Sequence, residues 1–326
     1  MTINNLPPLV TVFGGSGFVG RHVVRTLAKR GYRVRVAVRR PDLAGFLLPA
    51  GYVGQISLVQ ANLRYRQSVL KAAEGASHVV NCVGIMFESG RNTFDAVQDF
   101  GARAVADAAR AAGARLTHIS AIGADARSES SYARSKGRAE ATILSTLPDA
   151  VILRPSIMFG PEDSFFNKFA SMARTFPALP LIGGGKTKFQ PVYVEDVAET
   201  VARSVDGTIA SGKIYELGGG EVMTFRQCLE TMLRVTNRTN ALVSLPFGIA
   251  SLIGSIASLI PFVQPPITSD QVKLLKIDNV VSDAAATEGR TLQGIGIRPT
   301  LASSILPSYL VQYRPQGQYT GSGRAA

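Results

Sequence analysis

A run of glycines between an apolar segment and an amphipathic segment most constrains the fold of this chain. The apolar segment Leu9–Phe13 leads into Gly-Gly-Ser-Gly-Phe-Val-Gly, which places Gly14, Gly17 and Gly20 at every third position. In a strand-to-helix turn these glycines permit a tight bend, a close approach to a pyrophosphate and close helix packing, while the helix N-terminus attracts phosphates. The pattern predicts a dinucleotide-binding turn. Its residues are Gly14, Ser16, Gly17, Phe18, Val19 and Gly20.

Alternating apolar and helical segments predict the frame that holds this turn. Short runs rich in Val and Ile recur at 9–13, 34–38, 56–59, 78–82, 116–119 and 151–153. Longer Ala- and Arg-rich stretches with helical spacing lie between them, such as residues 101–112. Continuous apolar strands that alternate with helices are typical of a parallel sheet covered on both faces. We therefore predict an α/β fold, a Rossmann-type doubly wound parallel sheet with a smaller C-terminal α/β lobe.

The later part of the chain predicts this less regular lobe. The 326 residues exceed a single domain of ordinary size. Beyond Gly160 the alternation becomes irregular, with several prolines and a glycine triplet at 183–185. We predict a NAD(P)-binding Rossmann domain at 1–160, an interwoven substrate or interaction lobe at 161–313 that completes the fold, and a flexible tail at 314–326.

Composition and charge narrow the class of protein. The apolar fraction of 46% and the charged fraction of 18% are those of a folded globular chain. The net charge of +12 favours acidic partners, but no nucleic-acid-reading motif accompanies it, so no nucleic-acid partner is expected. Two widely spaced cysteines and the lack of a leader pattern suit a bacterial cytoplasm. The three histidines are predicted to be structural, and no metal is expected.

The end of the second predicted strand indicates which dinucleotide would bind. NAD sites usually carry Asp or Glu there for the ribose 2′-hydroxyl, whereas this strand ends in Val38, Arg39 and Arg40. A guanidinium matches a 2′-phosphate in a bidentate manner. Eight basic residues lie between Arg21 and Arg40, and the first acidic residue is Asp42. We expect NADPH with Arg39 and Arg40 as ligands, and NADH stays open as the alternative.

Two further strand ends contribute predicted cofactor contacts. Asn62 and Leu63 follow the third strand, where the Asn62 amide oxygen can accept from the adenine amino group. Val83 and Gly84 follow the fourth strand and would lie over the middle of the cofactor, since glycine removes a side chain from its path. For this second turn a plain strand-end turn is an equally good interpretation.

Three residues form a candidate reduction site. Tyr132 and Lys136 lie one helical turn apart on one face, and Ser120 ends the preceding strand. A cation at this spacing lowers the pKa of a phenol, and a serine hydroxyl polarises a carbonyl. The triad is therefore predicted as catalytic, with a vestigial triad as the open alternative. Tyr132 and Lys136 are also predicted to contact the cofactor.

The glycine turn, the Ser120, Tyr132 and Lys136 set and the segment Leu153–Gly160 resemble the extended or atypical short-chain dehydrogenase/reductase superfamily. The resemblance implies Pro155 and Ser156 as further cofactor contacts. Within it, residues 157–172, 190–197 and 266–272 are similar to the NADPH-binding accessory subunit family of respiratory complex I, the alpha-subcomplex subunit nine family. Gln98 stands where ordinary extended reductases usually have Asn, which puts a complete proton relay in doubt.

This resemblance implies a tightly held structural NADPH in a protein that assembles or stabilises NADH:ubiquinone oxidoreductase through contacts with its subunits, with independent turnover doubtful. An active NAD-dependent epimerase/dehydratase or NADPH-dependent reductase is the alternative. A quinone biosynthesis or delivery factor is a third hypothesis.

An uncharged apolar stretch supplies a candidate contact surface. Residues 245–263 carry no charge, and Pro246 and Pro261 bracket a predicted helix of about 14 residues, only about 21 Å long against roughly 30 Å of hydrocarbon. Spanning is not expected. The helix could meet a membrane surface or quinone, pack on a subunit, or cap a cleft in the protein's own core. We expect a peripheral location on the cytoplasmic face of the inner membrane.

Overall fold

The computed structural model describes residues 6–257 and 268–316 and divides them into two compact units. The first, called the sheet unit, contains residues up to Pro155 together with 194–217 and 283–297. The second unit contains residues 156–193, 218–257, 268–282 and 298–316. The predicted boundary at residue 160 thus lies five residues beyond the observed one. Two later stretches return to the sheet unit, so the lobe is interwoven with it.

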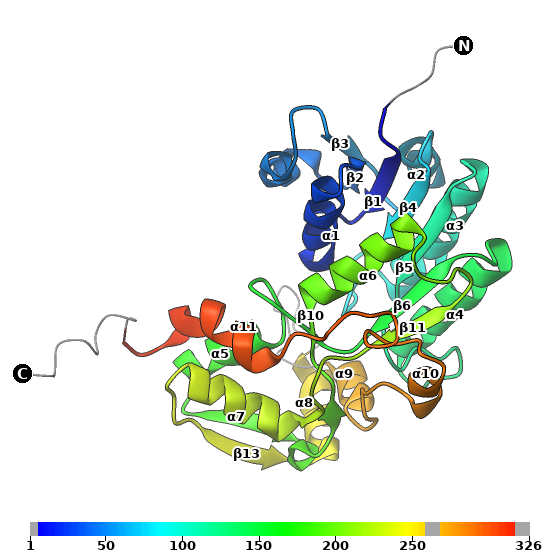
Figure 1. The fold of residues 1–326 in the computed structure, drawn as a ribbon. Helices are drawn as coiled ribbons and strands as arrows, with labels where there is room; N and C mark the ends of the chain where they lie inside the picture. Colours follow the sequence, from blue (N-terminus) through cyan, green and yellow to red (C-terminus); the bar gives the residue numbers. More distant parts are fainter. Residues whose placement is uncertain (1–5, 258–267, 317–326) are drawn as a thin grey trace, which may run out of the picture. The chain divides into compact units, whose positions relative to one another are not determined.

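The sheet unit is built on seven parallel strands in the order β11-β6-β5-β4-β1-β2-β3, drawn in Figure 1. The chain builds outward from β1 to β3 and then crosses to β4 on the other side of β1. The carboxyl ends of β1 and β4 therefore meet where the strand order reverses, the place where such folds bind ligands. The strands are β1 (Leu9–Phe13), β2 (Arg33–Val38), β3 (Ile56–Gln60), β4 (His78–Asn81), β5 (Arg115–Ile119), β6 (Val151–Pro155) and β11 (Ile214–Leu217).

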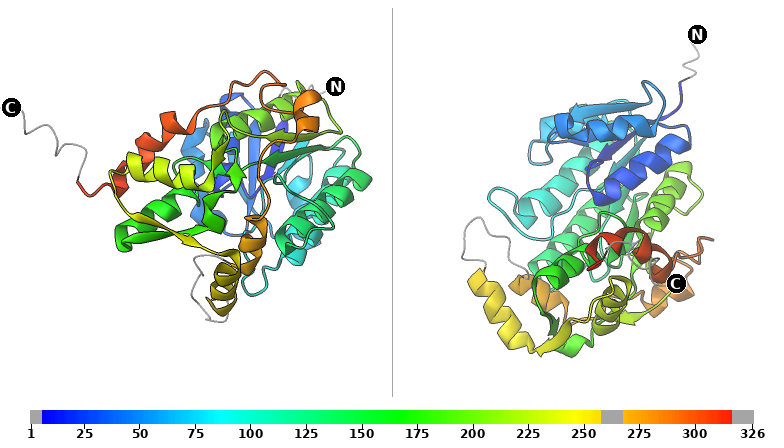
Figure 2. Two further views of the ribbon diagram at one scale, coloured as in Figure 1. Left: turned by 90° about the horizontal axis from the view of Figure 1, so that it is seen from below. Right: turned by 90° about the vertical axis from the view of Figure 1, so that its left-hand side faces the viewer.

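Helices cover both faces of this sheet. On one face α1 packs against α6, and on the other α2, α3 and α4 pack side by side, as Figures 1 and 2 show. A buried cluster of Val, Leu, Ile and Ala fills the second interface. The helical segments are α1 (Phe18–Lys29), α2 (Arg66–Ala73), α3 (Phe100–Ala111), α4 (Ser131–Thr146), α6 (Val194–Asp206) and α10 (Asp283–Thr287), with a 3-10 segment at Pro41–Ala50 and a π-helical turn at Asp95–Asp99.

The doubly wound prediction is confirmed, and the six predicted strands form within a few residues of their expected bounds. Residues of β1 and β4 are buried on both faces, which explains why their sequences are continuously apolar.

The second unit has a core of aromatic rings and three small two-stranded sheets. Phe165 packs against Phe166, Phe169, Phe189 and Phe225 with ring centroids 5.0 to 6.1 Å apart. The elements are β7 (Met158–Phe159), α5 (Phe166–Thr175), β8 (Ala178–Ile182), a 3-10 turn (Gly183–Gly185), β9 (Lys188–Phe189), β10 (Val192–Tyr193), β12 (Met223–Thr224), α7 (Phe225–Val235), β13 (Ala241–Leu245), α8 (Phe247–Ala257), α9 (Ser269–Leu274), α11 (Ala302–Leu310) and a 3-10 turn (Val311–Tyr313).

The apolar stretch 245–263 begins as a helix, as predicted. Helix α8 starts directly after Pro246 and is described to Ala257, and the rest of the stretch lies outside the described residues, as does the predicted tail beyond residue 316. Ile249 and Leu252 on this helix are exposed. Among the described helices, none is both long enough and apolar enough to cross a bilayer.

Candidate functional site: a dinucleotide cradle and a buried lysine

The glycine turn forms a backbone cradle between β1 and α1. Gly14 has φ +76°, and its N–H donates to Ala37 at 3.0 Å, which fixes the turn to β2. Gly17 is the N-cap of α1 and offers no side-chain cap to the first turn. At Gly20 a Cβ would lie 2.2 Å from the Gly14 carbonyl oxygen, so only glycine fits. Backbone N–H groups at an uncapped helix start fit the charge and shape of a pyrophosphate.

The turn after β4 lies against this cradle. A Cβ at Gly14 would be 2.9 Å from the Val83 side chain, and a Cβ at Gly84 would be 3.4 Å from the Lys136 ammonium nitrogen. Val83 and Gly84 therefore lie between the glycine turn and the predicted triad. The turns that follow β1 and β4 therefore meet at one edge of the sheet, with Lys136 of α4 beside them.

The basic residues after β2 have different environments. Arg40 is paired with Asp42 through two nitrogens, at 3.0 and 2.7 Å. Arg39 is exposed, and its Nη1 donates to a neutral acceptor, the Asn92 amide oxygen, at 3.3 Å. Because an acidic partner neutralises Arg40, Arg39 is the better placed of the two to meet a 2′-phosphate.

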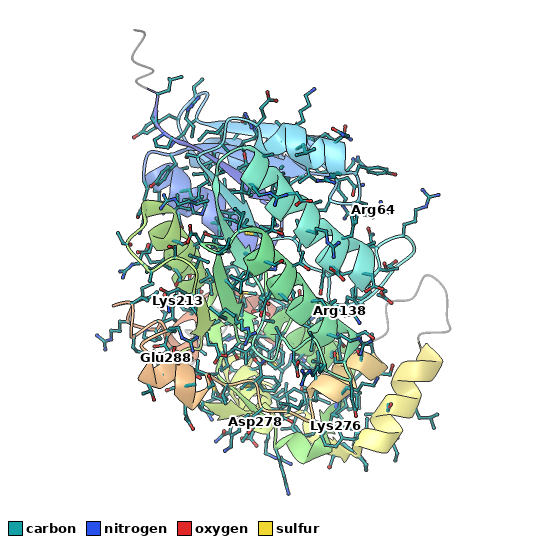
Figure 3. All side chains as sticks on the ribbon, turned by 90° about the vertical axis from the view of Figure 1, so that its right-hand side faces the viewer. Arg64, Arg138, Lys213, Lys276, Asp278 and Glu288 are labelled. Carbon is teal, nitrogen blue, oxygen red and sulfur yellow. The ribbon has the colours of Figure 1, made fainter. Side chains whose placement is uncertain are left out.

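The structure adds Arg64, labelled in Figure 3, to the basic residues near Arg39, since Arg64 bonds to Arg91 and Arg39 bonds to Asn92. Its backbone N–H and side-chain Nε both donate to the Asn62 amide oxygen, at 3.2 and 3.4 Å, and its Nη1 donates to the Arg91 carbonyl. The predicted acceptor for adenine is therefore already engaged in its own turn. Leu63 packs in the core against Gly101 and serves the fold. The sequence signal for Arg64 was its position in the turn that follows the third strand, four residues after Gln60.

Lys136 is buried beside the turn that follows β4. Its ammonium donates to the Ile119 carbonyl oxygen at 3.0 Å, and burial lowers its pKa to about 8. Burial also raises the pKa of Tyr132 to about 12. The expected lowering of the phenol pKa by the lysine is therefore not found. The Tyr132 ring instead packs edge-on against Phe94, with centroids 5.9 Å apart.

Ser120 belongs to a buried carboxylate network. Its hydroxyl donates to Glu140, one helical turn beyond Lys136 on α4. Glu140 also accepts from Arg154 at 2.9 and 2.5 Å, and Arg154 lies 3.6 Å from Glu216. Ser120 and Glu140 are each only 4% exposed. Sequence reasoning missed Glu140, although its spacing of four from Lys136 places it on the same helix face.

Gln98 hydrogen-bonds to two separate segments of the sheet unit. Its amide nitrogen donates to the Ile85 carbonyl at 2.6 Å, and its amide oxygen accepts from the Ser135 hydroxyl at 2.7 Å. Ile85 follows β4, and Ser135 is on α4 between Tyr132 and Lys136. Gln98 therefore ties the loop after β4 to the helix that carries the predicted triad.

The last two predicted cofactor contacts fall at the unit boundary. Pro155 ends β6, and its carbonyl accepts from Ile122 at 3.0 Å. Ser156 opens the second unit, where its hydroxyl donates to Asn279 and accepts from the Gln190 N–H at 3.2 Å. The structure gives Ser156 a structural role inside that unit.

The histidines lie in structural positions. Nδ1 of His22 is 2.6 Å from Glu195, while burial lowers the pKa of His78 to about 3 and that of His118 well below its usual range. Among the described residues, no group of His, Cys, Asp and Glu is arranged to hold a metal.

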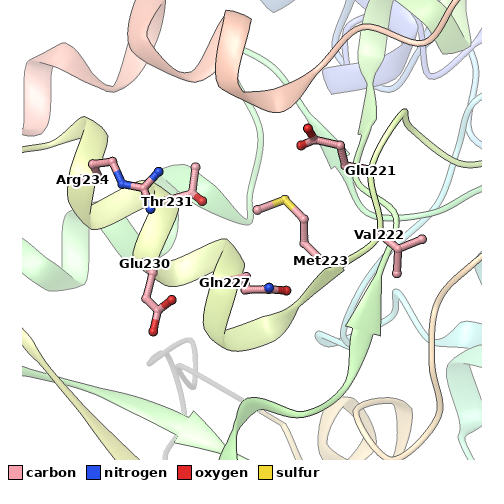
Figure 4. Close-up of a pocket in the computed structure, with 7 residues that line it drawn as sticks. All are labelled: Glu221, Val222, Met223, Gln227, Glu230, Thr231 and Arg234. Carbon is pink, nitrogen blue, oxygen red and sulfur yellow. The ribbon is translucent and has the colours of Figure 1, made fainter.

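A separate pocket of about 340 Å³ lies along α7 in the second unit, shown in Figure 4. None of the predicted site residues lines it. Its lining residues are Glu221, Val222, Met223, Gln227, Glu230, Thr231 and Arg234.

Comparison with known proteins agrees with this geometry. The family model of the NAD dependent epimerase/dehydratase family matches residues 10–218. NADH dehydrogenase [ubiquinone] 1 alpha subcomplex subunit 9, mitochondrial, of Arabidopsis thaliana is 34% identical over 325 residues, covering 96% of this chain and 80% of that protein. The ceramide reductase of Caulobacter vibrioides is 34% identical over 190 residues, covering 58% of each chain.

Among solved structures, the NADPH-dependent quinone oxidoreductase QOR2 of Escherichia coli, complexed with NADPH, has a TM-score of 0.70 at 20% identity and covers 92% of this chain and 99% of that one. This likeness shows the shared fold. The chain thus belongs to the NAD dependent epimerase/dehydratase family and, over nearly its whole length, to the family of NADH dehydrogenase [ubiquinone] 1 alpha subcomplex subunit 9.

Proposed function

We propose that this chain is an accessory protein of respiratory complex I that holds NADPH as a structural cofactor, on the cytoplasmic face of the bacterial inner membrane. The observation that carries the proposal is the 34% identity to a complex I subunit over 96% of the chain. The second predicted domain is included in that match, which a shared Rossmann fold alone would not require.

The cradle supports the cofactor half of the proposal. The Gly14, Gly17 and Gly20 turn would hold the pyrophosphate through backbone N–H groups, and Arg39 would meet the 2′-phosphate. Bound NADPH supplies a hydride donor. The triad residues that would face this hydride donor are Tyr132, whose phenol pKa is raised, and Lys136, which is held by a backbone carbonyl.

The Ser120 contact supports a holding role over turnover. A hydroxyl that donates to a buried carboxylate has no proton left to polarise a substrate carbonyl. The Tyr132 phenol is also hard to ionise, because burial raises its pKa. The triad therefore lacks a free serine hydroxyl and an easily ionised phenol, which are two of the three groups that its chemistry needs. We therefore infer that the chain holds the nucleotide without turning over a substrate.

The test combines two measurements on protein from the native organism. Nucleotide released from purified protein by denaturation is identified by mass spectrometry, and the expected species is NADPH or NADP⁺ at about one per chain. Membranes solubilised in mild detergent are run on a native gel, where the chain should migrate with complex I. Absence from that band, together with unchanged complex assembly in a deletion strain, would reject the proposal.

The second candidate is an active NADPH-dependent reductase, favoured by the similarity to a ceramide reductase and by the one-turn spacing of Tyr132 and Lys136. Steady NADPH oxidation with a defined carbonyl substrate, abolished by Tyr132→Phe while NADPH affinity is retained, would establish it. The proposed structural role predicts no such turnover.

A further inference from the structure

An exposed apolar patch lies on the connection between β2 and β3, drawn in blue in Figure 1. The 3-10 segment Pro41–Ala50 buries only Ala44 and Leu47. Around them, Leu43 is 65% exposed, Tyr52 is 85% exposed and Val53 is fully exposed. Single exposed apolar side chains are ordinary, but a contiguous group marks an interaction site. We call this group the β2–β3 patch, and it consists of Leu43, Phe46, Leu48, Tyr52 and Val53.

The chain holds this connection in a fixed place on the sheet unit. The Gln55 side chain donates to the carbonyls of Ala28 and Tyr32, at 2.7 and 3.0 Å, and accepts from the Tyr52 N–H at 2.9 Å. The guanidinium of Arg21 on α1 lies 5.0 Å from the centre of the Phe46 ring. Because the loop is already ordered, a partner would bind it at a small entropic cost.

The patch lies in the most basic part of the chain. The first 73 residues carry eleven basic residues and one acidic residue, Asp42. Some of this charge is neutralised locally, since Arg40 pairs with Asp42 and Arg30 pairs with Glu199 and Asp206. Helix α1 packs against the 3-10 segment, and its Arg21 places a positive charge beside Phe46 of the patch. A complementary surface would therefore be apolar at its centre and acidic at its rim.

The residue types favour a protein over a lipid as the occupant. Nine of the eleven basic residues are arginines, and the patch contains a tyrosine and a phenylalanine. Arginine and aromatic residues are enriched in protein interfaces, whereas lysine is depleted. The similar protein of Arabidopsis thaliana is itself named as a subunit of a larger assembly.

We propose that the β2–β3 patch is the surface through which this chain docks on an acidic-rimmed, apolar surface of a protein subunit. The proposal rests on the proposed function, because that subunit would belong to complex I. The sheet unit thereby supplies an assembly surface in addition to the cofactor site.

The test compares two triple variants that remove equal numbers of exposed apolar side chains. Leu43→Ser, Tyr52→Ser and Val53→Ser together alter the patch. The control variant combines Val222→Ser, Val243→Ser and Ile277→Ser in the second unit, where the three side chains are 54%, 54% and 65% exposed. Each is expressed in a deletion strain, and an unchanged melting temperature and bound nucleotide show that it folds.

The readout is the fraction of tagged chain that migrates with complex I on a native gel. We expect the patch variant to lower this fraction on the order of tenfold, the control to change it less than about twofold, and added salt to weaken the wild-type contact. If the patch variant still migrates with complex I like the wild type, or if the control loses this migration equally, the proposed docking surface is wrong. Either result leaves the proposed function intact.

If the wild-type chain itself does not migrate with complex I, the proposed function fails. Co-sedimentation with phosphatidylcholine vesicles containing phosphatidylglycerol separates the lipid alternative. Vesicle binding that the patch variant loses, without any effect on migration with complex I, would assign the patch to a membrane and overturn a protein partner.

Discussion

The Ser120 hydroxyl donates a hydrogen bond to the Glu140 carboxylate, and both groups are buried. Glu140 is also paired with Arg154 through two hydrogen bonds. The serine that the sequence assigned to a substrate carbonyl is thus part of an internal polar network that joins β5, α4 and β6. The catalytic interpretation of the triad loses one member through this single contact.

This network should contribute strongly to stability. Glu140→Gln keeps the shape of the side chain but removes the charge that Arg154 faces, so we expect a loss of about 1–3 kcal/mol in the free energy of unfolding. Urea denaturation at neutral pH measures it. Glu74→Gln, at an exposed glutamate of the same unit, is the control and should change stability by less than about 0.5 kcal/mol. Equal losses in the two variants would contradict the assignment.

Arg39 should select between the two nicotinamide dinucleotides. Arg39→Ala removes the guanidinium that we assign to the 2′-phosphate, so NADPH binding should weaken by on the order of 1–3 kcal/mol and NADH binding should hardly change. Isothermal titration with each nucleotide on nucleotide-free protein gives both affinities. The matched variant is Arg40→Ala, whose side chain is paired with Asp42, and it should lose less NADPH affinity. Similar losses for NADPH and NADH on Arg39→Ala would reject this role.

Gly20 should be essential for the cradle. In Gly20→Ala the new Cβ would lie 2.2 Å from the Gly14 oxygen and 2.6 Å from the Gly15 Cα, and since both are backbone atoms the turn itself must move. We expect a stability loss of about 1–3 kcal/mol, as for overpacking, with a marked loss of nucleotide affinity. Gly45→Ala serves as control because nothing lies within 4 Å of its Cβ position. Unimpaired nucleotide binding in Gly20→Ala would show that the site lies elsewhere.

Lys136 should give stability a distinctive pH dependence. Its pKa falls from 10.5 to about 8 on folding, so between these values the unfolded chain binds more protons than the folded one. Stability therefore rises with pH across this window, and the cost of burying the charged amine, up to roughly 3 kcal/mol, is fully present below pH 8. Tyr132 acts in the opposite direction only above pH 10, because its pKa rises on folding.

The measurement compares wild type with Lys136→Met in urea at pH 7 to 10 without added nucleotide. Lys136→Met should be the more stable at pH 7, and the difference should shrink as the pH rises. Lys29→Met, at an exposed lysine on α1, should show no pH-dependent difference. A gap between Lys136→Met and wild type that stays constant over this range would show that the buried amine keeps an ordinary pKa.

The local sequence was sufficient for the sheet unit because each of its elements is specified by nearby residues. Continuous runs of β-branched residues mark strands buried on both faces, and the glycine spacing from 14 to 20 has one compatible strand-to-helix turn. The same reasoning predicted that the turns after β1 and β4 lie together, because parallel strands end on the same side, and Gly14 does lie against Val83.

Hydrogen-bond partners from distant parts of the chain could not be predicted in this way. Ser120 meets Glu140, and Ser156 meets Asn279, 123 residues away. Such pairs depend on which side chains the packing brings together. A polar group that is buried away from water must hydrogen-bond to a group that the fold places beside it.

By itself the sequence determined the doubly wound sheet, the glycine cradle and the basic strand end, since these follow from local spacing and from the chemistry of single residue types. Only the tertiary structure decided what the buried polar groups do. Burial raised the pKa of Tyr132 and lowered that of Lys136. The packing of the chain also brought the Glu140 carboxylate to the Ser120 hydroxyl, which donates a hydrogen bond to it. Desolvation and long-range pairing are properties of the folded chain, and no local pattern of residues contains them.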